Sequence, residues 1–130
     1  MDHKQFLASL PQDEAAQLTT RRSAPGLWHL AGHLGLVLGM GLLIALKAPL
    51  WFLILPVQGI ALVFLFTLEH EATHRTPFAS DTLNDWVGRA CGLILVLPFE
   101  WFRYFHLAHH RYTNIPGKDP ELDGGQEHLN

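Results

Sequence analysis

Two long apolar runs dominate the first half of the chain. Neither Gly26–Leu46 nor Ala48–Leu68 contains an aspartate, glutamate, lysine or arginine, and a single lysine, Lys47, separates them. As an α-helix, each run would be roughly 31 Å long, which is about the thickness of the hydrocarbon core of a bilayer. Because Pro49 lies close behind Lys47, the pattern predicts two transmembrane helices joined by a tight turn.

A third apolar segment, Ala90–Phe99, is much shorter and contains Pro98. A helix of this length cannot cross a bilayer, so we expect an interfacial or re-entrant element over residues 83–105. Aromatic residues typical of a membrane–water interface flank it, namely Trp86, Trp101, Phe102, Tyr104 and Phe105. If this element does not cross, the polar segments before and after it lie on the same side of the membrane.

The fold class expected from this pattern is all-α and integral to a membrane. We expect a transmembrane helical hairpin followed by interfacial or re-entrant helices. The chain divides into an N-terminal segment over residues 1–24, a membrane domain over residues 25–122 and a polar tail over residues 123–130.

The positive charges predict an orientation. Arg21 and Arg22 precede the first apolar run, and Arg75 follows the second. Positively charged residues are enriched on the cytoplasmic side of membrane proteins. We therefore expect the N-terminus and the segment after the second run in the cytoplasm, with the hairpin in a plasma or inner membrane.

Composition excludes several classes of protein. Charged residues make up 16% of the chain, whereas about a quarter is usual for a soluble domain. The net charge of −3 offers no basic stripe for a nucleic acid. A single cysteine, Cys91, excludes a disulfide framework, a cysteine-ligated zinc site and an iron–sulfur cluster built from this chain alone. Histidine stands out, with nine residues.

Five of the histidines form two clusters at helical ligand spacing. The first cluster has two imidazoles at positions i and i+4, which project from one side of a helix, and the second occupies a wedge of about 100°. Imidazole suits iron and zinc. The sequence thus predicts a metal site on one side of the membrane. The expected ligands are His70, His74, His106, His109 and His110.

Each cluster also has a simpler interpretation when it is taken alone. The first could end a membrane span, and the second could lie on the polar face of an interfacial helix. His29 and His33 are also spaced i and i+4, near the start of the first run. For this pair a polar contact between helices or with headgroups is expected, and a ligand role stays open.

The two clusters resemble the histidine boxes of the membrane fatty acid desaturases. HEATH matches an H-x-x-x-H box and HLAHH an H-x-x-HH box, and RYTNIPGKDPEL is similar to the segment after the second box. The resemblance runs from about Leu50 to Leu122. It implies an oxidoreductase with two irons held by histidines, the five named above among them. It also implies O₂, an acyl lipid or acyl-carrier substrate, and electrons from a ferredoxin or cytochrome b5 type donor with its reductase.

One part of the family pattern is missing from these residues. The family has a third histidine box after a further pair of spans, and no such box follows His110. We therefore expect the chain to be the N-terminal part of a desaturase and to be inactive alone. The boxes also do not separate a desaturase from a membrane hydroxylase or ketolase.

Two alternatives belong to other classes. HEATH also fits H-E-x-x-H, the motif of zinc metalloproteases, in which Glu71 would be the general base. Asp123 in LDGG would then resemble the aspartate of an intramembrane protease, but it stands in a polar tail and the second cluster has no role. The other alternative is a non-catalytic membrane hairpin with incidental metal affinity.

Overall fold

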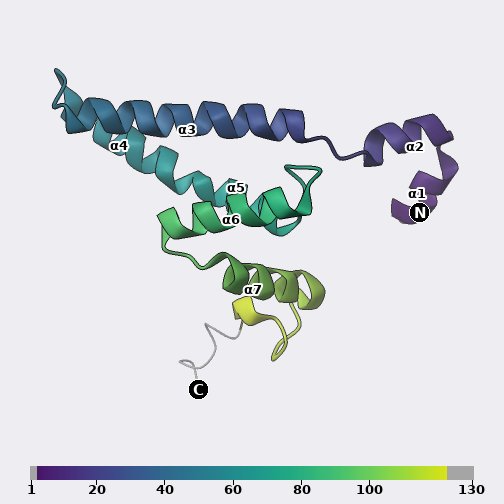
Figure 1. Cartoon of the computed structure of the whole chain (residues 1–130). Helices are drawn as coiled ribbons and strands as arrows, with labels where there is room; N and C mark the ends of the chain where they lie inside the picture. The colour runs from purple at the N-terminus through teal and green to yellow at the C-terminus, as the bar shows by residue number, and fades with distance from the viewer. Residues whose placement is uncertain (1–2, 123–130) are drawn as a thin grey trace.

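The structure, a computed structural model, describes residues 3–122 as seven α-helices without a strand in that part of the chain (Figure 1). The helices are α1 (His3–Ser9), α2 (Gln12–Thr19), α3 (Ser23–Ala45), α4 (Trp51–Val63), α5 (Leu65–Thr73), α6 (Asp81–Leu95) and α7 (Phe99–Tyr112). The polar tail over residues 123–130 lies outside the described residues.

Helix α3 and the pair α4–α5 form a long hairpin. The chain reverses between them at Lys47 and Leu50, which both have left-handed backbone angles, with φ of 50° and 62°. Two helical stretches are long and apolar enough to cross a membrane, one ending at Ala45 and the other covering Trp51–Thr73. The predicted all-α fold with a membrane hairpin is confirmed.

The hairpin has almost no core of its own. Only 6% of the most apolar stretch of the first helix and 11% of that of the second are buried. Large apolar side chains project outward along both helices, among them Leu36, Leu38, Leu42, Phe52, Leu53 and Ile60. Exposing apolar area to water costs about 25 cal/mol per Å², so this surface requires lipid or further helices around it.

His33 links the two arms of the hairpin. Its Nε2 donates a hydrogen bond of 2.8 Å to the carbonyl oxygen of Ala61, close to the interruption at Phe64 that separates α4 from α5. The contact has the form that the sequence predicted for this histidine, a polar link between helices. His29, one turn earlier, is exposed.

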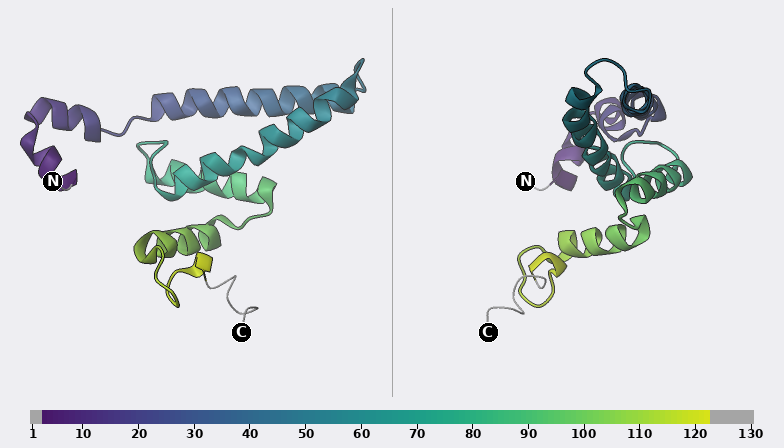
Figure 2. Two further views of the ribbon diagram at one scale, coloured as in Figure 1. Left: turned by 180° about the vertical axis from the view of Figure 1, so that it is seen from behind. Right: turned by 90° about the vertical axis from the view of Figure 1, so that its left-hand side faces the viewer.

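Helix α6 runs back beside α5 instead of crossing to the far side (Figures 1 and 2). A buried asparagine fixes the connection between them: the Asn84 side chain donates to the carbonyl oxygens of Phe78 and Ser80, both at 2.8 Å, and accepts from the Phe78 backbone at 3.2 Å. Ser80 also caps α6 by accepting from the Leu83 N–H. These bonds satisfy the backbone groups of the buried Phe78 and the carbonyl of Ser80 in this loop.

The predicted interfacial segment, residues 83–105, falls on two helices in the structure. Val96 ends α6 with a left-handed φ of 57°, and Pro98 is the N-cap of α7. Leu93 and Val96, at this turn, are 82% and 88% exposed, as expected for a tip that enters an apolar environment. The chain thus reverses direction between α6 and α7, as expected of a re-entrant element.

Gly88 lets α7 dock closely on α6. A Cβ at this position would overlap the ring of Phe99, which is itself only 2% exposed. Because the side chain of glycine is a single hydrogen atom, α6 and α7 can approach each other this closely at Gly88.

We predict that Gly88→Ala destabilises the protein by about 1–3 kcal/mol, the usual cost of overpacking a buried contact. Thermal unfolding in detergent measures the change. Gly59→Ala is the matched control, because nothing lies within 4 Å of a Cβ built there and alanine favours a helix. Equal melting temperatures for the two variants would contradict the packing role of Gly88.

Candidate metal centre

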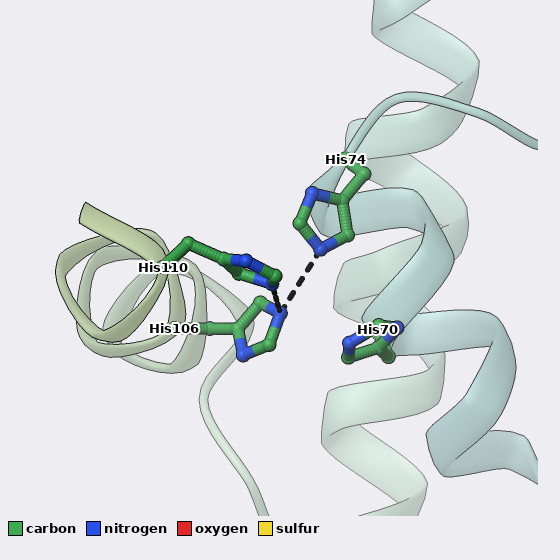
Figure 3. Close-up of side chains that lie close together, drawn as sticks. All are labelled: His70, His74, His106 and His110. Atoms are coloured by element: carbon green, nitrogen blue, oxygen red, sulfur yellow. Dashed lines mark hydrogen bonds between the residues drawn. The ribbon is translucent and has the colours of Figure 1, made fainter. Parts of the chain in front are cut away.

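Four histidines from two helices meet at one point (Figure 3). His70 lies on α5 and His74 caps its C-terminal end, while His106 and His110 project from α7. One ring nitrogen of each lies within 4.8 Å of those of the other three. His106 is buried, His70 and His74 are half-buried and His110 is exposed, so the group lies at an edge that solvent can reach.

Three Nε2 atoms form the centre of the group. The Nε2 of His106 lies 2.9 Å from the Nε2 of His74 and 2.9 Å from that of His110. The rings of His70 and His106 are also in contact, with centroids 4.4 Å apart. The two clusters predicted from the sequence therefore come together, although they belong to helices separated by α6.

The donor set fits a metal ion. Two nitrogens bound to one ion at about 2.1 Å and at right angles lie about 3 Å apart, close to the spacing of these Nε2 atoms. A neutral imidazole has one protonated and one unprotonated nitrogen, so three Nε2 atoms that face each other cannot all be satisfied by hydrogen bonds among themselves. A cation at this point would use every lone pair.

The electrostatics favour the neutral form of His74 and His106. Burial, together with the neighbouring His70 and His110, lowers the pKa of His106 from 6.5 to about 4. The pKa of His74 is lowered as well, mainly by burial and then by the same two neighbours. Neutral imidazole is the form that binds metal, so the site is ready for a cation at neutral pH.

A carboxylate next to the cluster orients one ring. The Nδ1 of His70 lies 3.2 Å from Oε1 of Glu71, and the other oxygen of Glu71 accepts from Oγ1 of Thr76 at 2.7 Å. A contact of this kind fixes the tautomer of a histidine and directs its other nitrogen. The Glu71 carboxylate therefore lies at the outer edge of the histidine group and does not point into it.

His109, the fifth predicted ligand, is not part of this group of four. Its Nδ1 lies 2.9 Å from Oδ1 of Asp119, a carboxylate that is only 1% exposed. Asp119 also accepts from the backbone N–H groups of Asn114 and Glu121. On α7, His109 and His110 lie on opposite sides of His106, so one ring faces α5 and the other faces the loop after α7.

Asp119 is the residue that reasoning from the sequence missed. The hydrogen bond from His109 to Asp119, and the charge of Asp119, raise the pKa of His109. Among the described residues no hydrogen bond engages the Nε2 of His109, so this nitrogen remains available to a metal. The only signal in the sequence was the segment RYTNIPGKDPEL, which contains Asp119 but does not reveal which side chain it contacts.

The fold and the site together define a helical membrane protein with a histidine cluster suited to hold a metal ion. Comparison with known sequences gives the family: the profile described as fatty acid desaturase matches residues 48–128, more than half of the chain. The chain belongs to the fatty acid desaturase family, as the two histidine clusters predicted.

The relatives carry names of the same kind. A protein named sn-1 oleoyl-lipid 12-desaturase from Arthrospira platensis is 40% identical over 82 residues, which is 60% of this chain and 23% of the relative. Its namesake from Anabaena variabilis is 33% identical over 120 residues, 89% of this chain and 32% of the relative. A chloroplastic omega-6 fatty acid desaturase from Glycine max is 33% identical over 84 residues, 62% of this chain and 19% of the relative.

The chain spans less than a third of the length of these relatives. No solved structure matches it at a significant level.

We predict that the metal-free protein loses stability as the pH falls from about 6.5 towards 4. Between these values an unfolded histidine binds a proton that folded His106 does not, so protonation favours the unfolded chain. Melting temperatures in detergent at several pH values measure the effect. Other groups titrate in the same range, so the His106→Asn variant is measured in parallel and should show a weaker pH dependence. A steeper dependence in the variant would contradict the prediction.

We further predict that Asp119→Asn lowers the pKa of His109, because the charged hydrogen-bond acceptor is lost. An NMR titration of the His109 ring measures the shift. Glu121→Gln is the control: Glu121 lies 3.4 Å from Nδ1 of His109 and is half exposed, so its removal should change the pKa less. A larger shift in the control would assign the effect to Glu121 instead.

Proposed function

We propose that this chain is part of a membrane fatty acid desaturase that uses O₂ to remove hydrogen from an acyl chain. The observation that carries the proposal is the convergence of His70, His74, His106 and His110 in a member of the desaturase family. Two histidine pairs separated by α6 meet with their Nε2 atoms at ligand spacing. No purely structural role requires neutral imidazoles to face each other in this way.

We infer that iron is the metal and that five histidines bind it. Imidazole suits iron and, unlike thiolate, resists oxidation. His109 would add its free Nε2 to the four converged rings, with Asp119 holding its Nδ1. The irons would supply the O₂ chemistry that cleaves an unactivated C–H bond, which side chains alone cannot supply. Five imidazoles are few for two irons, so we expect these 130 residues to need further ligands for activity.

The substrate and the reductant follow from the same proposal. The relatives from Arthrospira platensis and Anabaena variabilis carry an oleoyl-lipid in their names, which favours an acyl lipid over a soluble acyl carrier. The metal centre would lie at the cytoplasmic edge of the hairpin, next to Arg75. There a soluble ferredoxin or cytochrome b5 type donor, with its reductase, would deliver electrons.

The zinc metalloprotease alternative finds less support. Its general base would be Glu71, yet that carboxylate is engaged by Thr76 and by the outer nitrogen of His70. The alternative leaves His106 and His110 without a role, although both join the group. Asp123, its expected third ligand, lies outside the described residues.

The test is the metal content of the purified full-length protein. We expect two irons per chain and their loss in His74→Ala, since removing one of the converged rings opens the site. His29→Ala is the matched control, because this exposed histidine on α3 lies outside the group and its loss should leave iron in place. Stoichiometric zinc without iron would contradict the proposal.

The type of reaction can be determined from the lipids that the protein modifies. Mass spectrometry of lipids from cells that express the full-length protein distinguishes an acyl chain that has lost two hydrogens from one that has gained oxygen. An added oxygen atom would assign the protein to the hydroxylases or ketolases instead.

A further inference from the structure

One acidic residue of α6, Asp85, contacts cations that flank both histidine pairs. We propose that Asp85 is a positioning residue that holds α5 and α7 at the separation the metal requires. The inference rests on the proposed metal centre and adds to it a residue that binds neither metal nor substrate.

The first contact reaches α7. Nη1 of Arg103 donates to Oδ1 of Asp85 at 2.8 Å, and both side chains are largely buried, with 21% and 24% exposed. Arg103 precedes His106 by one helical turn and lies on the side of α7 that also carries His110. Its guanidinium lies 5.5 Å from the centroid of the Phe99 ring, the ring that packs against Gly88. The Arg103 side chain is thus held from two sides.

The second contact reaches the end of α5. Arg75 follows His74 directly and adopts a left-handed φ of 58°, so its side chain turns back toward α6. Its Nη1 donates to Oδ2 of Asp81 at 3.0 Å, and its Nη2 lies 3.9 Å from Oδ2 of Asp85. Arg21, ahead of α3, joins the same network by donating to Asp81 at 2.8 Å. The residue after His74 is therefore tied to α6 as well.

The two contacts explain how neutral rings come to face each other. The Nε2 of His106 lies 2.9 Å from the Nε2 atoms of both His74 and His110, and a neutral imidazole has one proton to share, so these contacts alone leave lone pairs unsatisfied without a cation. The half-buried carboxylate of Asp85 can supply the missing attraction on the α7 side through its hydrogen bond to Arg103, since charge-assisted hydrogen bonds are about twice as strong as neutral ones. On the α5 side, Arg75 at 3.9 Å adds a charge interaction without a hydrogen bond. Asp85 also neutralises two cations beside a site for a divalent ion.

A second ion pair between the same helices provides a matched control. Arg89 on α6 pairs with Glu100 on α7, and these side chains are 45% and 63% exposed. Glu100 lies in the first turn of α7, farther from His106 than Arg103. An exposed pair of this kind contributes little to stability. If general docking of α6 on α7 were all that mattered, the two pairs would be interchangeable.

The experiment titrates Co²⁺, a spectroscopic probe for imidazole sites, into the full-length protein in detergent. Asp85→Asn and Arg103→Gln should each raise the Kd for Co²⁺ about tenfold or more and change its visible absorption bands. The double variant should bind no more weakly than the weaker single variant, because both changes remove one contact. Asp85→Glu, which keeps the charge, should recover part of the affinity. Glu100→Gln should stay within about twofold of the unmodified protein.

Unchanged Co²⁺ binding in Asp85→Asn would overturn the inference, and so would an equal loss in Glu100→Gln. Circular dichroism checks that the helices persist in each variant. Should Asp85→Asn fail to fold, the comparison of Arg103→Gln with Glu100→Gln decides by the same criterion. A different result, no Co²⁺ binding by the unmodified protein, would overturn the proposed metal centre itself.

Discussion

The candidate site depends on the reversal of the chain between α6 and α7. Had α6 continued as a third span, the histidines of α5 and of α7 would lie on opposite faces of the bilayer, roughly 30 Å apart. The reversal has identifiable causes. Val96 takes a left-handed conformation that ends α6, and Pro98 starts α7 with its φ already set. The contacts between the imidazoles of α5 and those of α7 follow from this turn.

Buried polar side chains, together with the apolar contacts of residues such as Phe78 and Phe99, hold the part of the protein around the site. Asn84 satisfies the backbone of the loop before α6, Asp119 organises the loop after α7, and Asp85 joins the helices between them. Two of these are almost completely buried, with Asn84 at 0% and Asp119 at 1% exposure. Apolar side chains that face lipid gain little from packing against the rest of the protein, so they contribute little to the position of the loops. Directional hydrogen bonds and ion pairs therefore contribute more to that position.

The sequence predicted the elements well and their details less well. The charge-free runs predicted the hairpin, and the shortness of Ala90–Phe99 predicted that the chain would return, because both depend only on length and polarity. Spacing also placed His70 with His74 and His106 with His110. It could not show that His109 turns towards Asp119, because that depends on how the loop after α7 folds back. The same holds for Asp85, whose partners stand 10 and 18 positions away.

The lone pairs of the histidine group are not all satisfied until a cation enters it. Burial and mutual proximity lower the pKa of His106 to about 4, which means that a proton is a poor substitute for a metal there. The unprotonated nitrogens therefore remain available at neutral pH, and the cost in stability appears as the pH falls below about 6.5. The ion pairs of Asp85 and the hydrogen bond of Asp119 lie where they can offset it, one on each side of α7. A metal ion that satisfies these nitrogens would thus join α5 to α7 as well as supply chemistry.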